Sequence, residues 1–316
     1  MSIYLISLIV LVIIMLTYLK IAKRFEIVDK PNHRSSHKIV TIRGGGIVFP
    51  ISVFMYFILS GFEYPLFVLA VFIISAISFT DDIKPLNTSI RLAVQLIAVS
   101  LVIFQLYPQL PLIYSPIVLF IILGGINAYN FMDGINGITA SYSLVLLSTF
   151  YYINQSILFV NSDLIIFALI SVIVFLFFNF RTKALCFSGD VGSLSIALVI
   201  LFLLFKLIIF TAQPLYALFL IIYGIDTGHT LISRKLKGEN IFQPHRTHLY
   251  QQLVHLKGYS HLYVSFLFSF FQLGINYLTI FHLLKMENST IGSIILVILT
   301  FISYRLVKNN FLCGIN

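Results

Sequence analysis

The sequence contains few charged residues. Only 10% of its 316 residues are Asp, Glu, Lys or Arg, whereas an ordinary soluble domain contains roughly a quarter. The chain is 59% hydrophobic, includes 31 Phe and has a mean hydropathy of +1.01. This composition excludes most soluble folds and predicts an all-α polytopic membrane protein. At about 20 residues per span, residues 1–316 have room for about ten or eleven helices in one integral membrane domain.

Cysteine is also scarce, because only Cys186 and Cys313 are present. Two cysteines cannot build a disulfide framework or a Cys-based zinc site, so we treat both as unpaired. No basic stretch precedes the first apolar run, residues 1–19, and no small-residue cleavage signal follows it. The run therefore predicts a membrane helix, not a removable signal peptide.

Uncharged runs mark the predicted spans. Lys20, Lys23 and Arg24 follow the first run, which places the N-terminus outside and, with an odd number of spans, the C-terminus in the cytoplasm. We expect about eleven transmembrane helices, with ten as the alternative. The runs are residues 1–19, 44–62, 64–80, 92–132 (long enough for two), 134–162 and 164–180, and further spans start near 191, 214, 258 and 288.

The positive residues support this topology. Of the 20 Lys and Arg residues, all except Lys206 and Lys285 then lie in inner segments, and basic residues concentrate in cytoplasmic loops. The formal net charge of +9 therefore reflects orientation in a bilayer, and we expect no nucleic-acid partner. The predicted inner loops are residues 20–43, 81–91, 127–137, 181–193 and 234–258.

An acidic pair ends the third span. Adjacent Asp81 and Asp82 repel each other unless cations share them. Lys84 follows directly, and Arg91 opens the next helix, so this turn could hold a metal and a phosphate together. A merely solvated loop is the alternative for the pair alone.

The segment 127–137 combines three Asn, one Asp and two Gly in a nearly uncharged chain. Asn127 and Asn130 fall on adjacent turns of one helix face. Asp133 and Asn136 follow in a turn that glycines make compact. Isolated amides are commonly backbone caps, but this concentration of polar residues favours a site.

Asp190, within the segment Phe187-Ser188-Gly189-Asp190, precedes the eighth span. It could be a helix N-cap. It could also be a ligand of Mg²⁺, which prefers oxygen donors and often bridges to substrate phosphates. The amides of a helix N-terminus beside it would suit a phosphate oxygen.

The last inner loop contains His245-Arg246-Thr247-His248. Two histidines with no Cys or third His nearby fit a transition metal poorly, and the loop is basic, so phosphate binding is the better interpretation. A loop that is basic only for topology is the alternative. Asp226 in the ninth span could line the site, pair with a cation or lie at the interface. Gly44, Gly45 and Gly46 could allow close helix packing or a turn.

These segments all fall on the inner side of the predicted topology. Carboxylates, amides and phosphate-binding cations on one face predict metal-assisted chemistry on a pyrophosphate, with a membrane lipid as the second substrate.

The motifs resemble the polyprenyl-phosphate N-acetylhexosamine-1-phosphate transferases, a family of glycosyltransferase family 4 type. It includes bacterial undecaprenyl-phosphate N-acetylglucosamine-1-phosphate transferases, the phospho-MurNAc-pentapeptide translocase and the eukaryotic dolichyl-phosphate enzyme. The resemblance runs from Asp29 to about Gln252, with the motifs in family order. They are Asp29-Lys30-Pro31-Asn32 with Arg34 and His37, Asp81-Asp82, Asn127-x-x-Asn130-x-x-Asp133-Gly134-x-x-Gly137, Gly189-Asp190-Val191-Gly192-Ser193 and His245-Arg246-x-His248.

The resemblance implies transfer of a HexNAc 1-phosphate from a UDP-sugar to undecaprenyl phosphate, with release of UMP, in the bacterial inner membrane. It also implies Mg²⁺, for which Mn²⁺ may substitute, and is compatible with a homodimer. Carried over by motif, the implied catalytic residues are Asp81, Asp82 and Asp133, the metal ligands are Asp190 and Asn130, and the substrate-binding residues are Asn127, Asn136, Phe187, Arg91, Lys84, His245, Arg246 and His248. Among these, Phe187 would stack on uracil and Asn136 would contact it.

Two alternatives remain open. The peptidoglycan translocases have consecutive histidines where this chain has His245-Arg246-Thr247-His248, which favours enzymes that start O-antigen or capsule repeats, some with 6-deoxy sugars such as N-acetylfucosamine or N-acetylquinovosamine. A transporter or flippase for a lipid-linked sugar would suit about eleven spans. It would be expected to carry ionisable groups near the middle of the membrane, whereas these charges cluster at the inner boundary.

Overall fold

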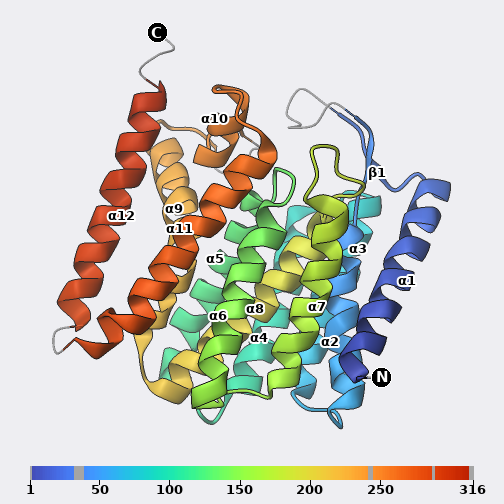
Figure 1. Ribbon diagram of the computed structural model, residues 1–316, viewed down its shortest axis with the longest axis horizontal. Coiled ribbons are helices and arrows are strands. Elements are labelled where there is room, and N and C mark those ends of the chain that lie inside the picture. Colours follow the sequence, from blue (N-terminus) through green and yellow to red (C-terminus); the bar gives the residue numbers. More distant parts are fainter. Residues whose placement is uncertain (1, 32–38, 241–244, 287–288, 313–316) are drawn as a thin grey trace.

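The computed structural model describes residues 2–31, 39–240, 245–286 and 289–312. Cys313 and three positions of the first motif, Asn32, Arg34 and His37, lie outside these residues. The described chain is a bundle of long helices that run roughly along a common direction (Figure 1). The long helices are α1 (Ile3–Arg24), α2 (Val48–Leu59), α3 (Pro65–Ile83), α4 (Thr88–Leu106), α5 (Ser115–Met132), α6 (Ile138–Ile157), α7 (Ser162–Asn179), α8 (Gly189–Thr211), α9 (Ile221–Leu236), α11 (His261–Phe281) and α12 (Ser289–Leu312).

Short elements complete the chain. A helix of seven residues, α10 (Leu249–His255), lies between α9 and α11. Two-residue strands β1 (Val28–Asp29) and β2 (Thr41–Ile42) pair antiparallel. The backbone of Ile42 also forms an isolated parallel β-bridge with that of Cys186. The described residues also form four 3-10 helices: η1 (Gly45–Ile47), η2 (Leu112–Tyr114), η3 (Pro214–Leu220) and η4 (Leu283–Lys285).

The fold confirms an all-α polytopic membrane protein. Long apolar segments form helices because a bilayer offers no partner for free backbone N–H and C=O groups. Within the described residues, nine helical segments are long and apolar enough to cross a membrane. The shorter segment Gly45–Leu59 and the polar-rich α6 are not among the nine. A helix occupies every predicted span, but the count of about eleven and the orientation stay predictions.

Two predicted inner loops are shorter than the sequence suggested. α3 continues to Ile83 and α5 to Met132, so the acidic pair and both amides of the second motif lie on the last helical turns. A polar residue at the end of a span can remain in the helix when a folded partner satisfies its side chain.

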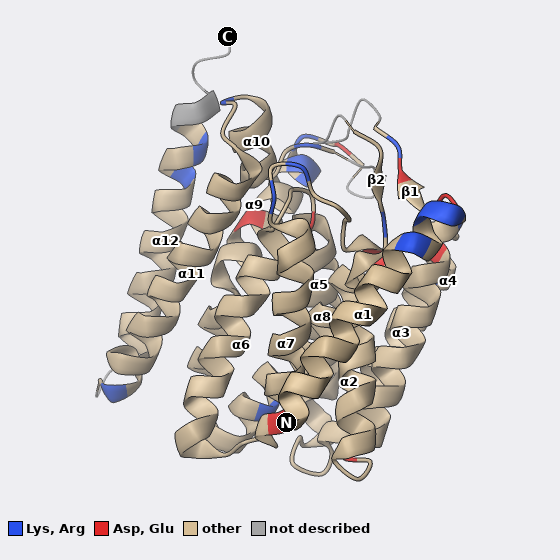
Figure 2. Cartoon of the chain, turned by 45° about the vertical axis from the view of Figure 1, so that its right-hand side comes forward, with Lys and Arg blue, Asp and Glu red and all other residues tan. Residues whose placement is uncertain are grey.

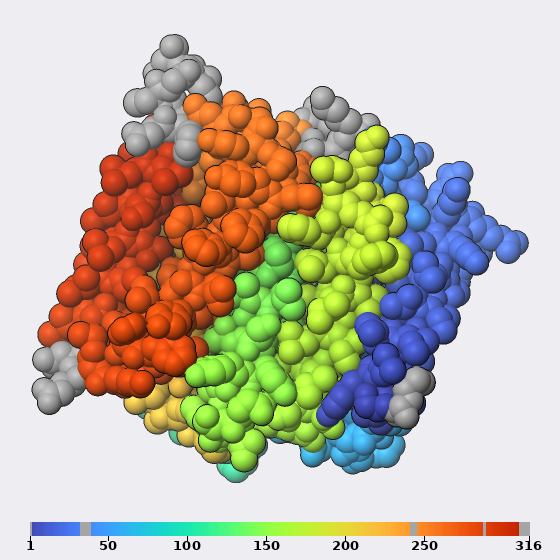
Figure 3. Space-filling view, viewed as in Figure 1, coloured from blue at the N-terminus to red at the C-terminus, as the bar shows by residue number. Residues whose placement is uncertain are grey.

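α8 is the central helix of the bundle. Of its hydrophobic window, 72% is buried, compared with 6% for α12 at the edge. α8 packs against α2, α3, α5 and α6, and the space-filling view shows α12 and α1 on opposite flanks (Figure 3). The start of α8 is therefore surrounded by the ends of neighbouring helices, and the charged residues of the chain lie mainly at that end of the bundle (Figure 2).

Candidate active site at one end of the bundle

Asp81 stabilises the turn between α3 and α4. Its Oδ1 accepts a hydrogen bond from the backbone N–H of Leu86, 2.6 Å away. Its Oδ2 accepts one from Nη1 of Arg91 at 3.2 Å. The predicted cation Arg91 therefore pairs with one member of the acidic pair, Asp81, from the first turn of α4.

Asp82 faces the start of α8 and is fully buried as a side chain. Its Oδ1 accepts the backbone N–H of Asp190 at 2.9 Å, and its Oδ2 accepts that of Val191 at 3.1 Å. The free N–H groups of a helix N-terminus favour a carboxylate there. Gly189 permits this approach, because it has a φ of +71° and a Cβ atom there would meet Asp82 Oδ2 and lie 2.8 Å from the backbone N of Gly44.

Arg43 connects two carboxylates and was not among the predicted site residues. Its Nε lies 2.7 Å from Oδ1 of Asp82, and its Nη2 lies 3.1 Å from Oδ1 of Asp190. Burial alone would lower the pKa of Arg43, but the two carboxylates outweigh it and raise that pKa. The signal that could have identified Arg43 is its position just before the triple glycine, which brings the chain against α8.

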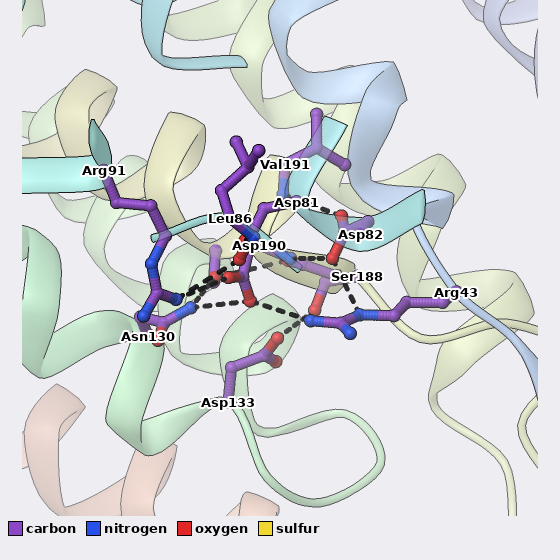
Figure 4. Close-up of polar contacts among 12 residues, drawn as sticks. Arg43, Asp81, Asp82, Leu86, Arg91, Asn130, Asp133, Ser188, Asp190 and Val191 are labelled. Atoms are coloured by element: carbon purple, nitrogen blue, oxygen red, sulfur yellow. Dashed lines mark hydrogen bonds and ion pairs between the residues drawn. The ribbon is translucent and has the colours of Figure 1, made fainter. Parts of the chain in front are cut away.

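Asp190 is the centre of the cluster (Figure 4). Its Oδ1 also accepts a hydrogen bond from Nδ2 of Asn130 at 3.1 Å, and its Oδ2 lies 3.8 Å from Nη1 of Arg91. Asn130 donates a second hydrogen bond to Ser193 Oγ at 3.0 Å. Two arginines and one amide therefore surround a carboxylate that sequence reasoning assigned to a metal.

Asp133 lies beside this cluster, after the end of α5. It accepts hydrogen bonds from Ser188 Oγ and, at 2.6 Å, from Thr139 Oγ1. Desolvation raises the pKa of Asp133 to about 6, although both hydrogen bonds lower it. Asp133 thus joins the turn after α5 to the residue that precedes α8.

Phe187 and Asn136 line one cavity of about 730 Å³. Nδ2 of Asn136 donates to the carbonyl oxygens of Arg181 at 2.8 Å and Thr182 at 3.4 Å. The backbone of Phe187 is fixed by a hydrogen bond from its N–H to the carbonyl of Ile42 at 2.8 Å. The two residues that the resemblance assigned to uracil therefore do share a concave surface, and their backbone is anchored.

A second, apolar cavity of about 1210 Å³ runs along α5, η3, α8, α9 and α12. It includes Ala128, two residues before Asn130 on α5. Its surroundings are mainly aliphatic, with two glycines of α5, Gly124 and Gly125, among the lining residues. A long apolar chain is the kind of ligand that this surface fits.

The histidine motif lies close to α5 but outside the cluster. The rings of His245 and His248 are 5.0 Å apart, and His248 is 6.3 Å from the ring of Phe131. Nδ1 of His245 accepts the backbone N–H of Thr247 at 3.4 Å. Burial, together with the neighbouring His248 and Arg234, lowers the pKa of His245 to about 4. His245 is therefore a neutral imidazole near pH 7.

Asn127 and Lys84 do not contact the cluster in the described part of the chain. Asn127 donates hydrogen bonds to Gln95 Oε1 at 3.0 Å and to the carbonyl of Leu123 at 2.8 Å. Lys84 follows the last turn of α3 and is exposed, and Arg246 is partly exposed in the loop before α10. Asn127 and Lys84 therefore do not hold the carboxylates of the cluster in place.

The donor set suits a magnesium ion only if a substrate completes it. Within the described residues, no group of three His, Cys, Asp or Glu side chains could hold a metal. Mg²⁺ typically uses one or two protein oxygens together with waters and phosphates. The Asp190 carboxylate and the Asn130 amide, which can present its oxygen after a flip, fit that chemistry.

The apolar bundle and the charged end cluster define an integral membrane protein with a site suited to a phosphorylated ligand. The family model of glycosyl transferase family 4 matches residues 64–208, which include α3 and most of α8. This match, over a little less than half of the chain, supports the relationship to the polyprenyl-phosphate N-acetylhexosamine-1-phosphate transferases.

Curated relatives agree. A "Probable undecaprenyl-phosphate N-acetylglucosaminyl 1-phosphate transferase" of Bacillus subtilis (strain 168) is 28% identical over 282 residues, which cover 82% of this chain and 78% of the relative. The undecaprenyl-phosphate alpha-N-acetylglucosaminyl 1-phosphate transferase of Escherichia coli (strain K12) is 24% identical over 74% of this chain and 71% of its own. A phospho-N-acetylmuramoyl-pentapeptide-transferase of Wolbachia pipientis wMel is 36% identical over 38% of this chain and 36% of its own.

Proposed function

We propose that the protein transfers a HexNAc 1-phosphate from a UDP-sugar to undecaprenyl phosphate in a bacterial cytoplasmic membrane, with release of UMP. The reaction would start an O-antigen, capsule or other envelope glycan. The observation that carries the proposal is the cluster of Arg43, Asp82 and Asp190. Asn130 contacts this cluster through Asp190. Residues close in sequence line the two cavities: Phe187 lies three positions before Asp190, and Ala128 lies two positions before Asn130.

The two cavities suit the two substrates. Phe187 offers an aromatic face, and Asn136 lies with it in the cavity of about 730 Å³, which fits a planar base. The apolar cavity along α5, α8 and α9 fits the polyprenyl chain, and its phosphate would then lie near Asn130. A soluble nucleotide and a membrane lipid could thus meet at one end of the bundle.

Asp190 and Asn130 would hold Mg²⁺ or Mn²⁺, whose chemistry is to offset charge on the diphosphate. Arg43 and Arg91 act in the same direction, because guanidinium groups pair with phosphate oxygens. The attacking phosphate monoester is largely ionised near pH 7, so it needs no general base. We therefore assign Asp81 and Asp82 to positioning Arg91, Arg43 and the start of α8, and we favour direct attack on the sugar-linked phosphorus.

The test is a panel of UDP-sugars, with UDP-N-acetylglucosamine and 6-deoxy N-acetylhexosamines, supplied with undecaprenyl phosphate and Mg²⁺ to the purified protein in detergent. We expect UMP and a lipid-linked sugar only when both substrates and the metal are present. Asp190→Ala should lower kcat by at least about a hundredfold, the usual effect of losing a group that stabilises transition-state charge. The matched control is Asp163→Asn, because Asp163 accepts a hydrogen bond from Tyr4 at the other end of the bundle.

Three results would contradict the proposal. One is transport of a labelled lipid-linked sugar across liposomes without UMP formation, which would indicate a flippase. Another is turnover of UDP-MurNAc-pentapeptide and of no other UDP-sugar, which would indicate the peptidoglycan translocase. The third is full activity of Asp190→Ala, which would remove the metal assignment.

A further inference from the structure

Asp226 of α9 is the centre of a buried polar network separate from Asp190. Its side chain is 0% exposed. Both carboxylate oxygens accept the backbone N–H of Leu249, at 3.0 and 3.2 Å, so Asp226 meets the start of α10. Tyr304 of α12 donates its hydroxyl to Oδ1 of Asp226 at 3.0 Å. One carboxylate therefore connects α9, α10 and α12.

Lys308 extends the network to the histidine loop. Its Nζ donates to Tyr304 Oη at 2.9 Å, to Thr230 Oγ1 at 3.2 Å and to the carbonyl oxygen of Thr247 at 3.0 Å. Lys308 is only 5% exposed, so its charge is balanced inside the protein, where Asp226 is the nearby acid. A buried charge is tolerated when a partner and hydrogen bonds accompany it.

His248 is the member of the network that is not fully satisfied. Its Nδ1 lies 3.4 Å from Oδ1 of Asp226, and the residue is 2% exposed. Within the described residues, both ring nitrogens of His248 are buried without a hydrogen-bond partner, so Asp226 approaches Nδ1 without hydrogen-bond geometry and Nε2 is left open. The ring lies beside Phe131, next to Asn130. A buried polar atom without a partner is costly in a folded protein unless a ligand satisfies it.

We propose that Asp226 is a positioning residue that aims Nε2 of His248 at an anionic oxygen of the donor diphosphate, and that Tyr304 and Lys308 of α12 hold Asp226 in place. The inference rests on the proposed transferase function and extends it to a helix outside the motifs. A carboxylate beside Nδ1 fixes the orientation and the tautomer of an imidazole. Nε2–H then donates to the phosphate oxygen.

The kinetic test is a double-mutant cycle of Asp226→Asn and His248→Ala. Each single variant should lower kcat/KM for the UDP-sugar by about tenfold, mainly by raising KM, since each removes the same hydrogen bond. The double variant should be no worse than His248→Ala. Multiplied effects, or an unchanged KM in Asp226→Asn, would overturn the inference.

Tyr304→Phe offers a gentler change with a matched control. Tyr304 and Tyr4 each donate a hydroxyl to an aspartate, at 3.0 and 2.7 Å, near opposite ends of the bundle. Tyr304→Phe should raise the donor KM severalfold, and Tyr4→Phe should not change it. Equal effects of the two substitutions on KM would show a general loss of stability and would contradict a specific role.

A second measurement does not depend on turnover. Diethyl pyrocarbonate modifies accessible imidazoles, and mass spectrometry can follow each histidine separately. Slow modification of His248 in the wild type should become faster in Asp226→Asn but not in Asp163→Asn. If the wild type forms no UMP from any UDP-sugar, the proposed function fails and this measurement still decides the positioning role. An unchanged rate at His248 in Asp226→Asn would refute that role.

Discussion

The carboxylate of Asp82 accepts a hydrogen bond from the backbone N–H of Asp190, 2.9 Å away across 108 positions of the sequence. One member of the acidic pair thereby orients the residue to which we assign the metal. The carboxylate oxygens of Asp82 accept hydrogen bonds from two backbone N–H groups, and Oδ1 also pairs with Arg43. Asp82 is therefore a structural anchor of the site before any substrate binds.

Asp82→Ala should lower both stability and activity. The substitution leaves the amides of Asp190 and Val191 and the guanidinium of Arg43 without their partner, at a cost of about 1–3 kcal/mol. The midpoint of thermal unfolding in detergent would measure this loss. Asp81→Ala, which keeps the two hydrogen bonds from the start of α8 to Asp82, should lower the midpoint less. Equal losses in the two variants would contradict the anchoring role.

Gly192→Ala should destabilise the protein through overpacking. A Cβ atom at Gly192 would lie 2.7 Å from Cα of Gly46 and 2.9 Å from Cβ of Ser188, and forced separation of packed segments costs about 1–3 kcal/mol. Gly274→Ala on α11 is the control, because nothing lies within 4 Å of the added atom. Its unfolding temperature should stay unchanged or rise slightly, since Ala favours a helix.

His245 should behave as an uncharged hydrogen-bonding group. Because its pKa is lowered to about 4, the imidazole is neutral throughout the range from about pH 5.5 to 8. The ratio of kcat/KM between His245→Gln and the wild type should therefore remain constant over this range. A ratio that changes around pH 6.5, the pKa of an ordinary imidazole, would show that His245 is charged in the working enzyme.

Asp133 should make stability depend on pH. Its pKa is about 6 in the folded protein and about 3.9 in an unfolded chain. The folded state therefore binds more protons between these values, and stability falls as the pH rises from about 4 to about 6. The unfolding temperature of the wild type minus that of Asp133→Asn should decrease over this window, measured with EDTA and without substrates. A constant difference would contradict the raised pKa.

Composition alone predicted much of the fold. Long runs without charge must form helices in a bilayer, and a helix occupies every predicted span. The boundaries were less predictable, because Asp81 and Asp82 remain in the last turn of α3. Arg91 was a predicted partner of the pair, but nothing local indicates that two amides of α8 satisfy Asp82 there.

The candidate site divides in the same way. Motif spacing identified Asp190 and Asn130, and the fold does bring these two into contact at 3.1 Å. Arg43 was missed because its position before the triple glycine does not show which carboxylates it meets. Only the approach of the triple glycine to α8 turns it into the bridge between two carboxylates.

The sequence by itself determined that this is a membrane protein of many helices with carboxylates, amides and cations near the helix ends, since hydropathy and residue type are local properties. Tertiary structure decided which charges pair. Asp226 illustrates the difference: the sequence left three interpretations open, and packing of α9 against α10 and α12 places it beside His248 and Tyr304. Such pairings depend on which helix ends meet, and that is fixed by packing of whole apolar faces.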